Sequence, residues 1–344
     1  MALLDIRNLS IDISTAQGKV RVIDKFSLTI VDGSIHALIG ESGSGKTLIA
    51  KAILGLHNDS WTVTADRLFL GKIDLTKLSN RERRKIMGED IAMIFQHPRS
   101  YLDPSKKILI QMKEILTGIS LKNKFFDLFK SRKKQSSMPR IKELLHRVGI
   151  QNDTEILNSY PHDLSEGVCQ KLMIAMAIAN NPRLLIADEP VTAMESVTQS
   201  QILRLLYKLN QLNNTTILLM SNNFSHIGDF ADYISLIYCG QMVESGSYKQ
   251  IISTAMHPYT EAMIKTVLHF EEGLNHKSLL YTLPGNIPSS NQLPIGCRLG
   301  PRCPRAQREC VQKPRSSHFK GHIVRCHFPT LNENKSKNDN TSPS

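Results

Sequence analysis

Residues 1–34 carry hydrophobic and polar side chains in alternation. Apolar positions such as Leu9 and Ile11 recur at every second residue, a period that predicts antiparallel strands with one buried face. The pattern changes to a continuous apolar run over residues 35–39, which predicts a strand buried on both faces. A glycine-rich turn follows this run, and a helix is predicted to begin at Lys46.

The apolar rhythm becomes helical over residues 100–180, most regularly at 169–180. Two further apolar runs, 184–187 and 216–220, predict buried strands, and a helical pattern at 201–212 separates them. Strands that alternate with helices are typical of an α/β fold with a parallel sheet.

The composition divides the 344 residues into three parts. Residues 1–255 are predicted to form one α/β domain, of which about 100–180 is helical. Residues 256–330 contain many prolines and four of the six cysteines, and they are predicted to form a small appended domain. Residues 331–344 are polar and are predicted to be disordered.

The net charge is +12, from 43 Lys and Arg against 31 Asp and Glu. A positive charge of this size makes nucleic acid and acidic lipid headgroups candidate partners. The excess gathers at residues 121–140, where seven basic residues accompany one aspartate. Basic residues interleaved with phenylalanines at 121–134 suit a membrane interface, and a solvated helix face is the alternative. Such a segment is weak evidence for nucleic-acid binding, so nucleic acid is disfavoured as a partner.

No uninterrupted apolar run approaches the length that a bilayer-spanning helix needs. The first residues also lack the basic and long apolar regions of a signal peptide. The chain is therefore expected in the cytosol unless other subunits hold it at a membrane.

A phosphate-binding motif follows the apolar run at 35–39. Residues 40–47 read Gly-Glu-Ser-Gly-Ser-Gly-Lys-Thr and fit the pattern G-x-x-x-x-G-K-[ST]. Glycines let successive backbone N–H groups turn toward phosphate oxygens, and the helix N-terminus behind them favours negative charge. Lys46 is predicted to reach the β- and γ-phosphates, and the Thr47 hydroxyl to ligate Mg²⁺. The residues predicted to hold a nucleotide here are Gly40, Ser42, Gly43, Ser44, Gly45, Lys46 and Thr47.

Two acidic residues end the apolar run at 184–187. Asp188 and Glu189 should lie at the carboxyl edge of the sheet, where ligands bind in open α/β folds. Asp188 is predicted to hold Mg²⁺ through water, and Glu189 to act as general base on the attacking water. A strand that ends in two acidic residues is common and by itself indicates only the end of a strand. Found together with the loop at 40–47, the pair argues against the alternative that this loop is a chance glycine-rich turn. Gln96 follows another apolar strand and is predicted to sense Mg²⁺ and the attacking water.

Ser165 and Gly167 stand at the predicted start of a helix, where Ser165 alone would be read as an ordinary N-cap. In this order and spacing, the motifs of residues 1–250 resemble those of the ABC transporter ATPases. The matching segments are 40–47 for the Walker A motif, Gln96 for the Q-loop, 164–168 for the signature, 184–189 for the Walker B motif with the catalytic glutamate, and 190–195 for the D-loop.

This resemblance implies a P-loop NTPase fold of the ABC cassette type. Such a cassette has a RecA-like parallel sheet core, an N-terminal antiparallel β subdomain and a helical subdomain. The resemblance also implies ATP and Mg²⁺ as ligands and a head-to-tail dimer. Each ATP then lies between the phosphate loop of one subunit and the signature of the other, where Ser165 and Gly167 are expected to bond the γ-phosphate.

Residues 256–326 are similar to the C-terminal extension of the oligopeptide and dipeptide importer ATPases, through HPYTEAMI and the segment from LPGNIP to QREC. Within that group, NTTILL and QLPIGCRLGPRCP resemble transporters that take up peptides, antimicrobial peptides among them. This resemblance implies a sister ABC ATPase as heterodimer partner, two transmembrane permease subunits and, indirectly, a periplasmic peptide-binding protein. It places the chain peripherally on the cytoplasmic side of the cell inner membrane.

Three positions depart from the family pattern. Glu166 replaces a signature glycine and brings a carboxylate toward the charge of ATP, and Glu195 replaces a D-loop aspartate. Asn222 stands where the family has a histidine that contacts the γ-phosphate. Because an amide carries no positive charge, the site on this phosphate loop is predicted to hydrolyse ATP slowly or mainly to bind it.

Four cysteines fall within thirty residues and supply enough thiolates for a closed metal site. The resemblance to dipeptide importers favours a [4Fe–4S] cluster over Zn²⁺, and free thiols in a small core are the third possibility. The four residues are Cys297, Cys303, Cys310 and Cys326.

Three functions compete for this sequence. The first is an ATP hydrolase that energises a peptide importer, and catalysis is assigned to Glu189, Gln96 and Asn222. The second is a mainly nucleotide-binding regulatory subunit whose sister hydrolyses ATP, motivated by the three departures. The third, an ABC ATPase that acts on nucleic acid or ribosomes, is disfavoured because such proteins usually carry two cassettes and this chain has one phosphate loop.

Overall fold

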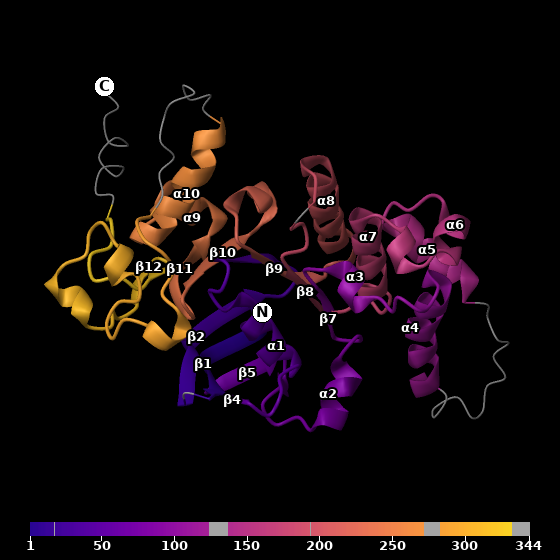
Figure 1. The fold of residues 1–344 in the computed structure, drawn as a ribbon, viewed down its shortest axis with the longest axis horizontal. Helices are drawn as coiled ribbons and strands as arrows, with labels where there is room; N and C mark the ends of the chain where they lie inside the picture. The colour runs from indigo at the N-terminus through magenta and orange to yellow at the C-terminus, as the bar shows by residue number, and fades with distance from the viewer. Residues whose placement is uncertain (17, 124–136, 193, 272–282, 332–344) are drawn as a thin grey trace, which may run out of the picture.

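A computed structural model describes residues 1–16, 18–123, 137–192, 194–271 and 283–331. Most of the basic segment at 121–134 and nearly all of the tail at 331–344 lie outside these residues, so the predictions made for them stay predictions. Helices α3 to α7 gather at one end of the molecule and the C-terminal segments at the other, with two sheets between them (Figure 1).

The N-terminal alternation forms an antiparallel sheet, as predicted. Its two long strands pair from Thr15↔Gly18 back to Ala2↔Val31, with register shifts that keep the apolar face inward. Three short strands, β4, β5 and β6, complete the sheet. The strand order is β2-β1-β5-β6, and β4 also pairs with β1. The strands are β1 (Ala2–Thr15), β2 (Gly18–Val31), β4 (Trp61–Thr64), β5 (Arg67–Leu70) and β6 (Ile73–Asp74).

The second sheet has eight strands in the order β12-β13-β11-β10-β3-β9-β8-β7. The five from β10 to β7 are parallel, which confirms the predicted parallel core, and the other three pair antiparallel. The strands are β3 (Ile35–Ile39), β7 (Ile91–Ile94), β8 (Leu184–Asp188), β9 (Thr216–Ser221), β10 (Tyr233–Tyr238), β11 (Gln241–Ser247), β12 (Ser317–Phe319) and β13 (His322–Val324).

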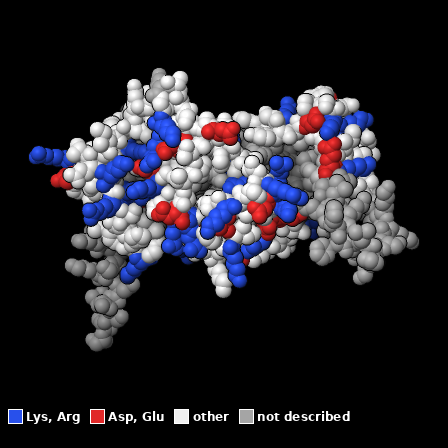
Figure 2. Space-filling model, turned by 90° about the horizontal axis from the view of Figure 1, so that it is seen from below, with Lys and Arg blue, Asp and Glu red and all other residues white. Residues whose placement is uncertain are grey.

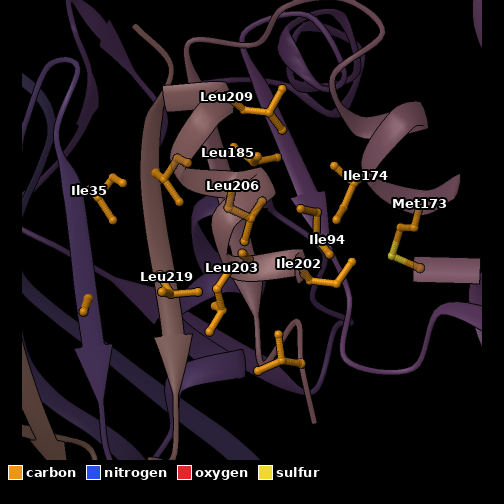
Figure 3. Close-up of a cluster of buried hydrophobic side chains, with 14 of the residues drawn as sticks. Ile35, Ile94, Met173, Ile174, Leu185, Ile202, Leu203, Leu206, Leu209 and Leu219 are labelled. Atoms are coloured by element: carbon orange, nitrogen blue, oxygen red, sulfur yellow. The ribbon is translucent and has the colours of Figure 1, made fainter. Parts of the chain in front are cut away.

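Successive residues of the central strands enter two different cores. Leu185 and Leu219 pack on the face covered by α8 (Ser196–Asn213), whereas Leu218 packs on the face covered by α1 (Lys46–Leu54). Figure 3 shows side chains from β3, β7, β8 and β9 meeting the apolar stripe of α8 at Ile202, Leu203, Leu206 and Leu209. Each buried aliphatic side chain contributes about 1.5–3 kcal/mol, so burial on both faces fixes these strands firmly.

Helices fill the region predicted to be helical, as expected. They bury apolar residues against β7 and α7, and Leu144 and Leu172 are fully buried there. The helices are α3 (Pro98–Tyr101), α4 (Ile108–Asn123), α5 (Met138–Arg147), α6 (Asp153–Asn158) and α7 (Glu166–Ala177). Helix α2 (Asn80–Ile86) precedes this region and has no fully buried residue.

The C-terminal segment, defined as the described residues from 256 onward, joins the central sheet. Strand β13 pairs with β11 at Glu244↔Val324, and Tyr259 of α10 (Pro258–Glu271) is fully buried in the main core. Helix α9 (Tyr248–Ser253) connects the two regions. The division into domains at residue 255 stays a prediction, while the pairing with β11 was not anticipated from the sequence.

Among the described residues, no helix is both long and apolar enough to cross a membrane. On the face drawn in Figure 2, Lys and Arg outnumber Asp and Glu, and the two kinds of charge are interspersed.

Candidate functional site

The phosphate loop connects β3 to α1 and depends on three glycines. Gly43 and Gly45 have φ values of 80° and 106°, a region that favours glycine. A Cβ on Gly40 would lie 2.3 Å from the carbonyl oxygen of Ile237 on β10, so the loop can leave the sheet here only without a side chain. Nearby, the buried Ser44 hydroxyl has no hydrogen-bond partner among the described residues, an orphan donor suited to a phosphate oxygen.

Lys46 is almost completely buried at the first position of α1. Its ammonium donates to the carbonyl of Gly40 at 2.7 Å and lies 3.3 Å from Oε1 of Glu189. Burial lowers the pKa of Lys46, and the Glu189 carboxylate opposes that shift. A buried cation held among loop carbonyls is positioned to meet a phosphate charge.

Thr47 and Asp188 form the candidate magnesium site. The Thr47 hydroxyl donates to Oδ2 of Asp188 at 2.7 Å. The other carboxylate oxygen, Oδ1, is buried without a hydrogen-bond partner among the described residues. Burial raises the pKa of Asp188, against the bond from Thr47, which lowers it. A hydroxyl and an under-satisfied carboxylate are hard oxygen donors, so the residues present fit Mg²⁺.

Glu189 gathers the remaining polar groups of the site. Its Oε2 accepts hydrogen bonds from Nε2 of Gln96 at 2.9 Å and from Oγ1 of Thr192 at 3.1 Å, and Nδ2 of Asn222 lies at 3.5 Å. The backbone of Glu189 has a φ of 46°, a conformation that costs about 1–3 kcal/mol for a non-glycine residue. The bond from its N–H to the carbonyl of Met220 on β9, 3.0 Å long, holds this conformation in place.

The strand order explains why these residues meet. Gly40, Asn222, Glu189 and Gln96 follow the carboxyl ends of β3, β9, β8 and β7, which are neighbours in the parallel part of the sheet. The structure therefore brings together the phosphate loop, the acidic pair, Gln96 and Asn222. Thr192 was missed by sequence reasoning, although its place three residues after Glu189 in a turn is a usable signal.

Ser165 and Gly167 lie apart from this group. No hydrogen bond or ion pair within the described part of the chain joins them to the phosphate loop. Ser165 caps α7 by accepting from the N–H of Val168 at 3.3 Å, the role that a helix N-cap serine has in general. The carboxylate of Glu166 pairs with Arg99 at 3.3 Å, which offsets the negative charge at the start of α7.

The four clustered cysteines line one small shared pocket. All are free thiols, and burial raises the pKa of Cys326 to about 11. Four thiols around one space match a four-thiolate site in number and kind. However, in the described part of the chain no three His, Cys, Asp or Glu side chains are arranged to hold a metal ion.

The central group has the parts that hydrolysis of a nucleoside triphosphate requires. Lys46 and the loop amides can bind phosphates, Thr47 and Asp188 can hold Mg²⁺, and Glu189 can accept a proton from water. Phosphoryl transfer depends mainly on such positioning and charge stabilisation.

Two family models match the sequence. The one described as ABC transporter matches residues 23–192. The one described as the C-terminal region of oligopeptide/dipeptide transporters matches residues 243–310.

Curated relatives span nearly the whole chain. The peptide transport system ATP-binding protein SapD of Escherichia coli O157:H7 is 51% identical over 329 residues, which cover 96% of this chain and 98% of that protein. SapD of Haemophilus influenzae is 48% identical over 343 residues, covering 99% and 97%. The dipeptide transport ATP-binding protein DppD of Escherichia coli strain K12 is 36% identical over 331 residues, covering 96% and 97%.

Among solved structures, the dimeric bacterial ABC transporter cassette MJ0796 matches with a TM-score of 0.60 at 24% identity, over 71% of this chain and 98% of that one. This likeness confirms the predicted cassette fold. The predicted resemblance to peptide importers is confirmed by the relatives and by both family models. The chain belongs to the ABC transporter family, within its oligopeptide and dipeptide transporter group.

Proposed function

We propose that this chain is the ATP-binding and ATP-hydrolysing subunit of a peptide importer. The observation that carries the proposal is the meeting of Lys46, Thr47, Asp188 and Glu189 at one edge of the parallel sheet. The names of the relatives, a peptide transport and a dipeptide transport ATP-binding protein, support peptides as the cargo class.

The contacts among these side chains support the roles proposed for them. Lys46 and the loop amides bind the β- and γ-phosphates, Thr47 and Asp188 hold Mg²⁺, and Glu189 takes a proton from the attacking water. Gln96 and Asn222 orient Glu189 through the contacts to its Oε2. Ser165 and Gly167 contribute to a second nucleotide, bound on the phosphate loop of a partner ATPase.

The proposal also assigns the partners and the location. A sister ABC ATPase completes a heterodimer. ATP hydrolysis by this pair drives a conformational change in two permease subunits at the cytoplasmic side of the inner membrane. A periplasmic peptide-binding protein supplies the cargo, and antimicrobial peptides are one class of it. Nucleic acid has no place in this scheme.

The experiment is Glu189→Gln in the purified, reconstituted transporter. ATP turnover and peptide uptake should fall by at least about a hundredfold because the general base is lost, while MgATP binding stays. Glu143→Gln, which changes an exposed glutamate on α5, should leave both activities at the wild-type level.

Asn222 favours a second candidate, a nucleotide-binding regulatory subunit whose sister hydrolyses ATP. It places a neutral amide 3.5 Å from Glu189. Under this alternative, Glu189→Gln leaves uptake intact, and the same substitution in the sister ATPase abolishes it.

We further propose a structural [4Fe–4S] cluster on Cys297, Cys303, Cys310 and Cys326, with Zn²⁺ as the alternative. A shared cavity lined by all four thiols supports it. When bound, such a group would staple loops that have little apolar core of their own. Anaerobically purified protein should show the visible absorbance of an iron–sulfur cluster and contain four irons per chain. Zinc by elemental analysis would support the alternative, and four titratable thiols without metal would contradict both.

A further inference from the structure

An arginine of the C-terminal segment reaches into the phosphate loop. Arg302 ends a short 3₁₀ turn, Gly300–Arg302, and is only 8% exposed. Its Nη1 lies 3.0 Å from Oε2 of Glu41, and its Nη2 lies 3.5 Å from Oε1 of the same carboxylate. Glu41 is the second residue of the phosphate loop, so a side chain 261 positions away in the sequence forms a two-pronged ion pair with the loop.

Two tyrosines fix this pair. Arg302 also donates to the hydroxyl of Tyr238 at 3.3 Å, and its guanidinium lies 5.8 Å from the centre of that ring. The backbone N–H of Glu41 donates to the hydroxyl of Tyr259 at 2.9 Å. The Tyr238 and Tyr259 rings pack 5.0 Å apart. Both ends of Glu41, its amide and its carboxylate, are therefore held by groups outside the loop.

A second arginine of the same segment braces the loop from another side. The guanidinium of Arg298 donates to the carbonyl of Cys239. The next residue, Gly240, donates its N–H to the carbonyl of Ser44 in the loop at 2.8 Å. Arg298 therefore supports the turn between β10 and β11, which itself contacts the phosphate loop.

The charge of Glu41 is the reason that the loop needs Arg302. A carboxylate in a phosphate-binding loop repels a triphosphate, and partial burial reduces the screening by water. Arg302 is a permanent cation whose planar fork matches the carboxylate. We infer that Arg302 is a positioning residue for nucleotide binding, which neutralises Glu41 and holds its side chain turned away from the phosphates. The inference rests on the proposed nucleotide role of the loop.

The test is binding of a non-hydrolysable ATP analogue with Mg²⁺ to the full-length chain, measured by calorimetry. Arg302→Gln should raise the Kd about tenfold, since it leaves Glu41 charged and free. Arg302→Lys should lie between, because it keeps the charge and loses the fork. Arg315→Gln, an exposed arginine of the same segment, should bind like the wild type.

The double variant Arg302→Gln, Glu41→Gln separates charge neutralisation from a merely structural role. Because the unpaired carboxylate is gone, the double variant should return to within about threefold of the wild-type Kd. A double variant as weak as Arg302→Gln alone, or an Arg302→Gln Kd equal to that of Arg315→Gln, overturns the inference. If the wild type itself binds no analogue, the proposed function fails instead.

Discussion

At the residue scale, one carboxylate organises the site. Glu189 pairs with Lys46 through one oxygen and collects the side chains of Gln96, Thr192 and Asn222 at the other. Lys46 is the one positive side chain in this set. Preorganised charge is the largest contribution to catalysis of phosphoryl transfer in most analyses. Because the Asn222 amide is neutral, we expect this site to hydrolyse ATP slowly.

Replacing Asn222 by His should raise ATP turnover in the purified transporter by about tenfold. A histidine can present a charged donor beside Glu189, where the amide presents a neutral one. The matched control is Asn223→His at the exposed neighbouring position, which should leave turnover unchanged. Equal turnover in the wild type and in Asn222→His would contradict this account of Asn222.

A buried histidine on the strand before the phosphate loop should make stability depend on pH. His36 is 3% exposed, its Nε2 lies 2.8 Å from the hydroxyl of Ser235, and burial lowers its pKa to about 4. Between pH about 6.5 and about 4, the unfolded chain binds a proton at this position that the folded chain does not. The free energy of unfolding should therefore decrease on acidification by up to about 1.4 kcal/mol per pH unit.

Urea unfolding between pH 7.5 and 5.5 measures this dependence (pH values chosen about the ordinary histidine pKa). In His36→Gln the decrease should be shallower by that amount below pH about 6.5. Exposed His146 on α5 offers the control, and His146→Gln should keep the wild-type slope. Identical slopes for the wild type and His36→Gln would rule out His36 as the source.

At the element scale, the site is the common carboxyl edge of β3, β9, β8 and β7. Local patterns predicted these strands well, because a buried parallel strand is a continuous apolar run with a clear boundary. The same patterns predicted the phosphate loop and the acidic pair, whose chemistry is encoded within a few residues. Strands β10 and β11 were not predicted, although β10 is itself a largely apolar, buried run that pairs parallel with β3.

Contacts between distant segments were also beyond the sequence. The pair Arg302–Glu41 joins positions 261 apart, and nothing local distinguishes Arg302 from other arginines near the cysteines. The Glu166–Arg99 pair is similar, because the direction of the Glu166 side chain depends on how α3 packs against α7. Sequence reasoning identified Glu166 as a departure but could not supply its partner.

The junction between β3 and α1 gives a stability prediction at this scale. Gly40→Ala would place a Cβ 2.3 Å from the backbone of Ile237, which should lower the free energy of unfolding by about 1–3 kcal/mol. At Gly300 an added Cβ meets nothing within 4 Å, so Gly300→Ala should stay within about 0.5 kcal/mol of the wild type. Urea unfolding of the two variants compares them directly, and equal stabilities would contradict the packing of the loop against β10.

At the scale of the whole molecule, the phosphate loop belongs to the cassette and is also contacted by the C-terminal segment. The segment adds β12 and β13 to the central sheet and sends Arg302 and Arg298 behind the phosphate loop. Within the described residues no hydrogen bond joins Ser165 or Gly167 to that loop, and their contribution to a nucleotide on a partner ATPase stays a proposal. The contacts of the C-terminal segment with this loop were seen only in the structure.

The central claim is that Lys46, Thr47, Asp188 and Glu189 surround a magnesium-bound triphosphate. Equilibrium dialysis of the intact transporter with MgATP tests it most directly, with Lys46→Ala in this chain and the surface variant Lys77→Ala as control. The account predicts that Lys46→Ala loses one bound nucleotide per complex and that Lys77→Ala loses none. An unchanged number of bound nucleotides in Lys46→Ala would contradict it.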